Sequence, residues 1–340
     1  MQTIQISEHE HGQRMDKFLS SYFDKAPKSF IYKMLRKKNI KLNKKKADGS
    51  DLLSSGDEIQ LFLADDTISG FHTETVKKKN AARLKKMILK DAGDIVYEDN
   101  NVIFFNKKSG ILSQKSRPED ESLNDALLDY VMNKDTKDDK ETSKNDFSSF
   151  TPSICNRLDR NTSGLITFAK NYQSARVLNE MFRDRSVSKY YITVVHGSMT
   201  EGKKVSAFLK KMDNSNQVVV RNEYFDGAAE IKTEYSTVAS NGEMSILKVK
   251  LITGKTHQIR AHLSYLGYPI IGDTKYGDRR VNELYKKKYS INSQILHSYE
   301  LVFPEIKGNI LENLSEQSFK AELPYKLKLL FKYIQPVNNI

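Results

Sequence analysis

Short segments with the composition of β-strands recur from residue 95 onward, and they constrain the fold more than any other feature of the sequence. They occupy residues 95–106, 165–170, 189–197, 229–240 and 243–252. These segments are rich in β-branched and aromatic residues, and turn-forming residues separate them. Amphipathic helical patterns lie between some of them, in SLNDALLDYVM, which begins at Ser122, and in SARVLNEMFRD. The order predicts a mixed α+β domain dominated by antiparallel strands.

The length and composition of the chain exclude several classes of protein. At 340 residues it is long enough for about two domains, and 38% hydrophobic residues can build a sizeable core. No window approaches the ~20 apolar residues of a membrane helix, and the N-terminus lacks the basic-then-apolar order of a signal peptide. The single cysteine, Cys155, excludes an intramolecular disulfide framework and a cysteine-rich zinc site. We therefore expect a soluble cytoplasmic protein, with a monomer as the default state.

The first 63 residues have the pattern of a small separate module. Apolar residues at helical spacing predict one helix that starts at Met15 and ends at Pro27, and a second through SFIYKMLRKK. The segments IKLN and DEIQLFL have the pattern of short strands, with Gly56-Asp57 as a turn.

Two further segments lack the pattern of a folded core. Residues 64–93 carry few strand signals and contain a basic run that could form a helix, so we interpret them as a basic linker. The larger domain then covers residues 94–340. Within it, residues 133–146 are charged and of low complexity, which predicts a loop.

Positive charge is concentrated near the N-terminus. The net charge is +12, from 55 Lys and Arg against 43 Asp and Glu, and nine basic residues with no acidic one lie between Lys28 and Lys46. Clustered positive charge attracts polyanions because binding releases their condensed counterions. The alternative is a solvated lysine-rich surface. We favour a binding surface, because these basic residues alternate with an ordered apolar pattern.

The N-terminal module resembles the S4 RNA-binding domain. The resemblance covers about 50 residues and rests on GQRMDKFL, PKSFIYKMLRKKNIKLN and SGDEIQLF, which follow one another in the order of that domain. It implies binding to structured RNA, with candidate phosphate contacts at Lys28, Lys33, Arg36, Lys37, Lys38, Lys41 and Asn43.

Four polar clusters occur in strand or turn settings of the larger domain. They read CNRLDRNTSG (155–164), SKYYITVVHG (188–197), LITGKTHQIRAHLSYLGYPIIGDTKYG (251–277) and ILHSYELVFP (295–304). No glycine-rich nucleotide-binding loop accompanies them. His257 and His262 are five residues apart, which does not fit a zinc site on one face of a helix. Taken residue by residue, Tyr191 can also be a core tyrosine and His257 a structural hydrogen bonder.

Together these clusters resemble the RluA/RluC/RluD group of RNA pseudouridine synthases, and with the S4-like module the chain is most similar to the RluC-like enzymes of 23S rRNA. The resemblance implies that Asp159 is the catalytic nucleophile. It further implies that Tyr191 stacks on the target uracil, that Arg260 pairs with Asp159, and that Leu296 packs beneath the base. We expect Arg157 and Arg160 to position RNA phosphates or to brace the loop.

Three positions depart from the pattern of that group. Asn156 stands where histidine is frequent, Thr193 where alanine is frequent, and Lys108-Ser109 where a proline-containing turn is usual. None of the three removes a residue with an implied catalytic role.

The implied reaction is an isomerisation, so neither a cofactor nor a metal is expected. The target base has to leave its stack, at a cost of a few kcal/mol, and aromatic stacking at about 1–3 kcal/mol per base offsets much of that cost. Arg260 is expected to keep Asp159 ionised in a dry pocket and to fix the direction of its carboxylate.

Two alternatives remain at this point. One keeps the chemistry and changes the substrate to tRNA. The other is a non-catalytic RNA-binding factor of ribosome assembly, which has no need of a carboxylate that faces phosphates. In every case the expected partner is RNA, with neither DNA nor a membrane involved.

Overall fold

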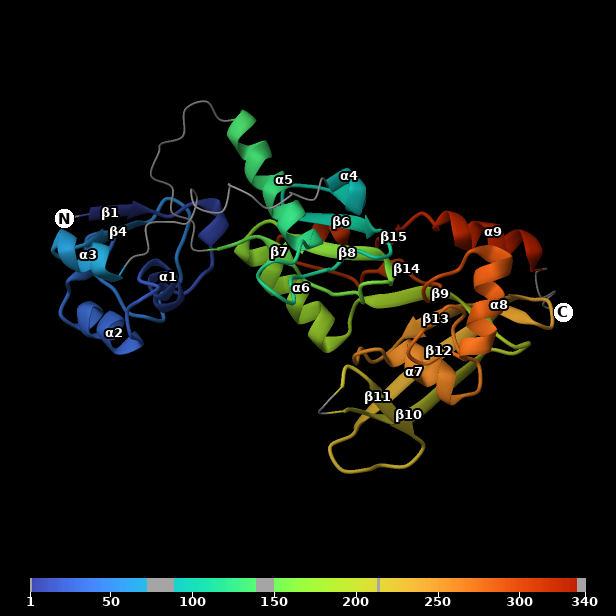
Figure 1. Ribbon diagram of the computed structural model, residues 1–340. Coiled ribbons are helices and arrows are strands. Elements are labelled where there is room, and N and C mark those ends of the chain that lie inside the picture. The colour runs from blue at the N-terminus through green and yellow to red at the C-terminus, as the bar shows by residue number, and fades with distance from the viewer. Residues whose placement is uncertain (1, 72–88, 139–149, 213–214, 335–340) are drawn as a thin grey trace.

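The computed structural model describes residues 2–71, 89–138, 150–212 and 215–334, and its N-terminal part is a small α+β unit (Figure 1). Strands β1 (Gln2–Gln5), β2 (Ile40–Leu42), β3 (Lys45–Lys46) and β4 (Glu58–Leu61) form an antiparallel sheet in the order β1-β4-β2-β3. The 3₁₀ helix η1 (Glu8–Glu10) and helices α1 (Met15–Tyr22), α2 (Lys28–Arg36) and α3 (Asp65–Phe71) complete the unit.

The two helices expected in this unit are present, with one difference at their junction. The residues expected to face inward are buried: Met15, Phe18, Leu19 and Tyr22 on α1, and Ile31, Met34 and Leu35 on α2. However, α1 ends at Tyr22, and Pro27 is the N-cap of α2 rather than the end of α1. Proline fixes φ near −65°, the value that it has here, and this conformation suits the entry to a helix.

The expected linker carries helical structure at both ends. In α3, the side chains of Ile68 and Phe71 pack against the N-terminal core. Helix α4 (Leu89–Ala92) leads into the larger domain, where Ala92 is fully buried. Most of the basic run, residues 77–88, lies outside the described residues, and its last two residues begin α4.

The larger domain is built on one mixed sheet, which has eleven strands within the described residues. The strand order is β11-β10-β12-β13-β9-β14-β8-β6-β5, with β15 beside β14 and β7 beside β8. All pairings are antiparallel except that of β14 with β8. The strands are β5 (Gly93–Glu98), β6 (Val102–Lys107), β7 (Ser153–Ile154), β8 (Ser163–Ala169), β9 (Ser188–His196), β10 (Lys203–Lys211), β11 (Val218–Arg221), β12 (Ala229–Ser240), β13 (Met244–Leu251), β14 (Leu296–Val302) and β15 (Ser318–Lys320).

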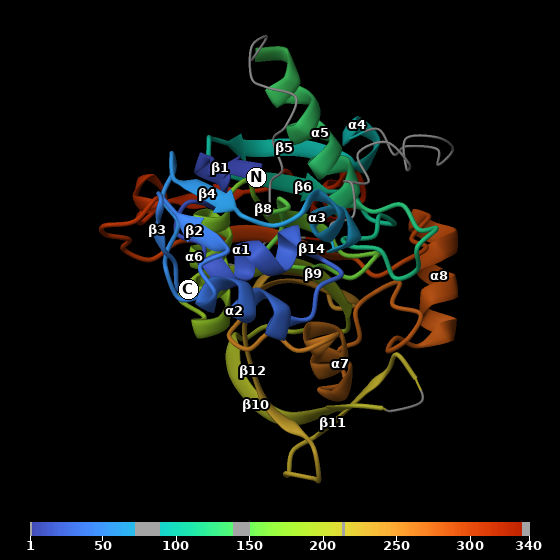
Figure 2. The same ribbon diagram turned by 90° about the vertical axis from the view of Figure 1, so that its left-hand side faces the viewer.

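Helices lie against the large sheet or beside it (Figures 1 and 2). They are α5 (Leu123–Asp138), α6 (Tyr172–Asp184), α7 (Gln258–Tyr265), α8 (Arg279–Tyr289), α9 (Tyr325–Tyr333) and the 3₁₀ helix η2 (Glu312–Leu314). Because α5 continues to Asp138, the expected loop at 133–146 is helical in its first six residues. The rest of that loop lies outside the described residues.

Strand β6 shows why the central strands have continuous apolar sequences. Ile103 and Phe105 belong to the buried cluster on one side of the sheet, which also contains α5 and α7 residues. Val102 and Phe104 belong to the cluster on the other side, which α6 covers. Since both faces are covered, successive residues are buried and no polar alternation is visible.

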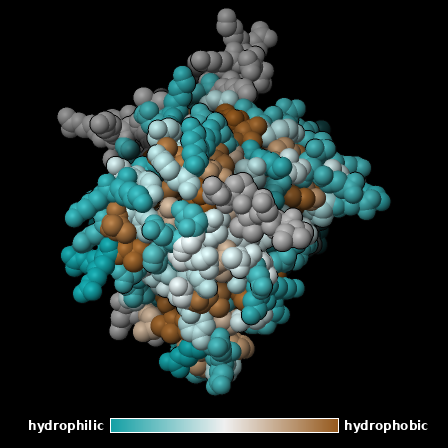
Figure 3. Space-filling view, turned by 90° about the vertical axis from the view of Figure 1, so that its right-hand side faces the viewer, coloured by the Kyte–Doolittle hydropathy of each residue, from teal (hydrophilic) through white to brown (hydrophobic). Residues whose placement is uncertain are grey.

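The fold is thus a small antiparallel sheet domain followed by a large mixed-sheet domain with flanking helices, as the sequence predicts. Among the described residues, no helix combines the length and the apolar character needed to cross a membrane. Figure 3 shows the face that carries α8 and α9, where hydrophilic side chains predominate and hydrophobic ones form only separate small areas.

Candidate active site

Asp159 lies in the loop between β7 and β8, and the loop that follows β6 holds it in place. Ser113 Oγ donates to the Leu158 carbonyl at 2.8 Å and accepts from the Leu158 amide at 3.1 Å. The amide of Gly110 donates to the Arg160 carbonyl at 2.9 Å. The backbone on both sides of the carboxylate is therefore fixed by hydrogen bonds from one neighbouring segment.

Lys107 reinforces this arrangement from inside the protein. Its side chain is fully buried, and Nζ donates to the carbonyls of Lys108, Ile111 and Arg160 at 3.0, 2.9 and 3.1 Å. Burial lowers the pKa of Lys107 to about 7, although the charge of Asp159 opposes that fall. Sequence reasoning missed this residue because Asn-Lys-Lys is indistinguishable from a surface turn.

The Asp159 carboxylate is in contact with Arg260, the partner that the sequence resemblance implies. Arg260 Nη1 lies 2.8 Å from Asp159 Oδ2. The other side of the guanidinium faces Asp273, with Nε at 2.7 Å from Oδ2 and Nη2 at 2.9 Å from Oδ1. One arginine thus joins an accessible carboxylate, 29% exposed, to a fully buried one.

Arg260 and Asp273 stabilise each other's charge. Burial opposes a charge on Arg260, but the hydrogen bonds to Asp273 and Asp159 outweigh it and raise the pKa of the guanidinium. Burial likewise opposes ionisation of Asp273, and the Arg260 bonds outweigh it, so the pKa of Asp273 falls below its usual value. Asp273 lies in the GDTKYG segment of the third polar cluster. The composition of that cluster indicated a functional site, but it did not single out this aspartate.

Arg260 is carried by helix α7, where the sequence predicts a strand or turn setting. Six consecutive residues of α7, Gln258 to Leu263, are buried, so the helix has no polar face whose period could reveal it. Gln258 fixes the start of the helix: its Oε1 accepts from Thr253 Oγ1 at 2.8 Å, and its Nε2 donates to the Lys232 carbonyl at 3.1 Å. The polar residues Gln258, Arg260 and His262 are thus internal hydrogen bonders of a buried helix.

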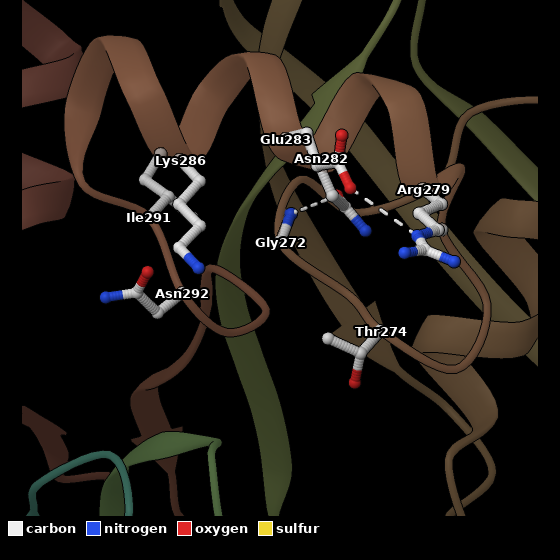
Figure 4. Close-up of a pocket in the computed structure, with 9 residues that line it drawn as sticks. Gly272, Thr274, Arg279, Asn282, Glu283, Lys286, Ile291 and Asn292 are labelled. Carbon is white, nitrogen blue, oxygen red and sulfur yellow. Dashed lines mark hydrogen bonds and ion pairs between the residues drawn. The ribbon is translucent and has the colours of Figure 1, made fainter.

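The loop that carries Asp273 is held from behind by helix α8. Asn282 accepts from the Gly272 amide at 2.8 Å and donates to the Asp273 carbonyl at 2.9 Å. Asn282 also lines a cavity of about 450 Å³ on the α8 side of this loop, together with Lys286 and Asn292 (Figure 4). The loop therefore contributes Gly272 and Thr274 to the cavity lining and Asp273 to the contact with Arg260.

Tyr191 and Leu296 lie on neighbouring strands of the sheet. In the β9–β14 pairing, Leu296 is opposite Thr193 and Tyr191 is opposite Ser298, so Tyr191 and Leu296 are diagonal neighbours on one face. Both are 6% exposed and belong to the same buried cluster as Leu158. Burial raises the pKa of Tyr191 to about 12, and the charge of Asp159 adds to the rise.

The other candidate residues are mainly at the surface. Arg157 and Arg160 have exposed side chains on either side of Asp159. In the N-terminal unit, Lys28, Lys33, Arg36, Lys37 and Lys38 are exposed, and Lys41 is half-buried over the Phe62 ring. Asn43 has a structural role: its amide donates to Asp57 at 2.7 Å and accepts from the Glu58 amide at 2.9 Å.

The positions that depart from the family pattern have local partners. The Asn156 side chain accepts from the Thr167 amide at 2.7 Å and donates to the Leu165 carbonyl at 3.2 Å, which ties the Asp159 loop to β8. Thr193 Oγ1 donates to the Ile295 carbonyl at 2.7 Å. Ser109 Oγ donates to the Asn161 carbonyl at 2.9 Å, so the segment without proline still contacts the loop.

Solved structures include proteins with the same fold. The chain is 24% identical to the human protein called RNA pseudouridylate synthase domain containing 4, with a TM-score of 0.55 over 74% of this chain and 97% of the other. At this identity the likeness concerns the fold alone.

Comparisons of the sequence identify the family. A family model described as RNA pseudouridylate synthase matches residues 101–265. An uncharacterized RNA pseudouridine synthase of Mycoplasma genitalium is 30% identical over 94% of this chain and 95% of its own length. The ribosomal large subunit pseudouridine synthase C of Vibrio cholerae is 30% identical over 89% of each chain. Synthase D of Borreliella burgdorferi is 30% identical over 90% of this chain and 87% of its own. The chain therefore belongs to the RluA-type family of RNA pseudouridine synthases, isomerases that convert uridine in RNA to pseudouridine.

Proposed function

We propose that this enzyme isomerises specific uridines of large-subunit ribosomal RNA and that Asp159 is its nucleophile. The observation that carries the proposal is the Arg260–Asp159 contact at 2.8 Å, in which a buried guanidinium holds a partly accessible carboxylate. A charge-assisted hydrogen bond fixes the direction of the carboxylate. The backbone bonds around Leu158 and Arg160 add rigidity, and a rigid mount is what a nucleophile needs for a reproducible angle of attack.

Tyr191 and Leu296 supply the apolar surfaces for the extruded uracil. They are diagonal neighbours on one face of the sheet, and their cluster reaches Leu158, the residue before Asp159. A ring stacked on a base offsets part of the cost of unstacking it from the RNA. Arg157 and Arg160 are exposed on the same loop and are suited to bind the phosphates that flank the target nucleotide.

The choice of ribosomal RNA rests on the relatives and on the N-terminal unit. Several relatives are named ribosomal large subunit pseudouridine synthases. The exposed basic residues of α2 lie on a unit that is consistent with an S4 domain, and they give it a surface for RNA phosphates. We further propose that the protein acts as a monomer in the cytoplasm, on RNA rather than DNA.

The substrate is tested by mapping pseudouridines in total RNA from cells with and without this protein. The proposal predicts that one or a few pseudouridines disappear from 23S rRNA and return when the intact gene is restored. If the missing positions lie in tRNA, the substrate is wrong and the chemistry stands. If no position disappears, the protein is not a synthase for these RNAs.

The role of the N-terminal unit is tested in the full-length chain by reversing the charge of α2. Lys33→Glu combined with Lys37→Glu should weaken binding to 23S rRNA. It should also reduce the slope of log affinity against log salt concentration by about one for each phosphate that is no longer neutralised. Lys307→Glu, at an exposed lysine of the larger domain, is the matched control. Equal salt dependence in the two variants contradicts a role of α2 in RNA binding.

A further inference from the structure

The Arg260 guanidinium is shared between two carboxylates, which leaves the site with a net negative charge. Its three hydrogen bonds at 2.7–2.9 Å go to Asp273 and Asp159. One positive and two negative charges sum to −1. Lys107 adds no further donor to the site, because its Nζ donates to three backbone carbonyls. These groups therefore offer no spare positive charge to a substrate that lies beside Asp159.

The isomerisation itself moves negative charge onto the base. When Asp159 forms a bond to C1′, the N1–C1′ bond breaks and its electron pair stays on the uracil, which becomes an anion delocalised over N1 and the two carbonyl oxygens. The base then turns, and C5 bonds to C1′ as the bond between C1′ and Asp159 breaks. C5 afterwards releases its proton and N1 takes one up. Catalysis of such a step requires a hydrogen-bond donor placed where the charge develops.

His257 is placed to be that donor. It is the N-cap residue of α7, with a left-handed φ of 53°, and its side chain is 10% exposed. Nε2 lies 3.8 Å from Asp159 Oδ2, which is too long for a direct hydrogen bond. The ring nitrogen thus faces the region next to the nucleophile without being bound to it.

A hydrogen-bond chain from β11 orients the imidazole. The Val218 amide donates to Tyr276 Oη at 2.9 Å, and Tyr276 Oη lies 2.9 Å from His257 Nδ1. Because the hydroxyl oxygen already accepts one proton, its own proton is available for Nδ1. This order leaves the hydrogen of a neutral imidazole on Nε2, the nitrogen that faces Asp159.

The surroundings favour the neutral ring. Burial lowers the pKa of His257 below its usual value, and the charges of Arg260 and Lys275 act in the same direction. Asp159 and Asp273 act in the opposite direction. A neutral Nε2–H donor does not form a tight ion pair with Asp159, so it remains available to another acceptor.

We propose that His257 is a further catalytic residue, whose Nε2–H donates a hydrogen bond to a carbonyl oxygen of the extruded uracil and stabilises its anion. This inference rests on the proposed role of Asp159, since it assumes that the base lies beside that carboxylate. No proton is transferred by His257 in this role. The Tyr276 hydroxyl acts as a positioning group, because it sets which ring nitrogen carries the hydrogen.

Two substitutions at this position separate the donor from the rest of the side chain. Both asparagine and glutamine offer an amide, but only glutamine extends to the position of Nε2 (His257→Gln), whereas asparagine ends near Nδ1 (His257→Asn). Asparagine also tolerates the left-handed backbone. In the His257→Asn variant, the single-turnover rate on 23S rRNA transcripts with 5-tritiated uridine should fall by about 10²-fold or more. His257→Gln should stay within about tenfold of the wild type. RNA affinity should be unchanged in both, and both should remain folded at the assay temperature.

The positioning role is tested with Tyr276→Phe, alone and combined with His257→Gln. A glutamine amide carries its hydrogens without help, so Tyr276→Phe should slow the wild-type enzyme and have no further effect in the glutamine background. A wild-type rate in His257→Asn refutes the donor role. A glutamine variant that is folded, binds RNA and is as slow as the asparagine variant refutes it as well. An active Asp159→Asn enzyme instead overturns the proposed function, so the two failures are distinguishable.

Discussion

Replacement of Arg260 by lysine tests whether the shape of the guanidinium matters beyond its charge. Arg260 uses three nitrogens, two toward Asp273 and one toward Asp159. Lysine keeps the charge on a single nitrogen and cannot reproduce this fork. Because Asp273 is fully buried and Asp159 is accessible to water, we expect the lysine to pair with Asp273.

The size of the effect follows from the hydrogen bonds that lysine cannot make. Hydrogen bonds to charged groups contribute about 1.5–3 kcal/mol each. Loss of the bond to Asp159 should therefore slow the chemical step by about 10- to 150-fold, since about 1.36 kcal/mol corresponds to a factor of ten. Loss of one bond to Asp273 should lower the free energy of unfolding by a similar amount, about 1.5–3 kcal/mol.

The assay is tritium release from 5-tritiated uridine in RNA under single-turnover conditions, with RNA affinity and urea unfolding measured in parallel. Arg183→Lys, at an exposed arginine of α6, is the matched control and should behave as the wild type. If Arg260→Lys has a wild-type rate while it is folded and binds RNA, the fork is not needed and the reasoning is wrong.

Three further predictions concern the support of the site and the pH dependence of stability. Asn282→Ala removes two hydrogen bonds to the Asp273 loop. It should therefore lower the single-turnover rate more than the RNA affinity. An unchanged rate contradicts the role of α8 as a support of this loop. Gly164→Ala places a Cβ 2.2 Å from the Ser298 carbonyl oxygen, whereas the control Gly242→Ala has a similar positive φ and no atom within 4 Å. In urea unfolding, Gly164→Ala should therefore lose at least about 1 kcal/mol more stability than Gly242→Ala. Burial lowers the pKa values of His262 and His297 to about 4. Since these histidines take up protons near pH 6.5 in the unfolded chain, the unfolding free energy should fall by about 1.5 kcal/mol per histidine between pH 6.5 and 5. A profile that is equally steep in His297→Gln excludes this cause for that histidine.

The elements that a single sequence predicted are those with a strong local period. The strands around Asn100-Asn101 and the helices at Met15 and Ser122 have apolar spacing that packing then satisfies. Strand β10 was missed because KKVSAFLKK is charged at both ends. Helix α7 was missed because its first six residues are all buried.

In the candidate site too, some residues were predicted from the sequence and others were not. The resemblance paired Asp159 with Arg260 although 101 positions separate them, and the structure places the two in contact. Asp273 and Lys107 were not assigned, because what defines them is burial against partners far apart in the chain. Local sequence carries no sign of such burial for a charged residue.

The most direct test of the central claim is the single-turnover tritium release of Asp159→Asn. The amide keeps the size of the side chain and removes the nucleophilic charge. We expect no detectable release, with RNA affinity close to that of the wild type. Asp226→Asn, at a fully exposed aspartate, should release tritium at the wild-type rate. Release from Asp159→Asn at a rate close to that of Asp226→Asn contradicts the assignment of Asp159 as the nucleophile.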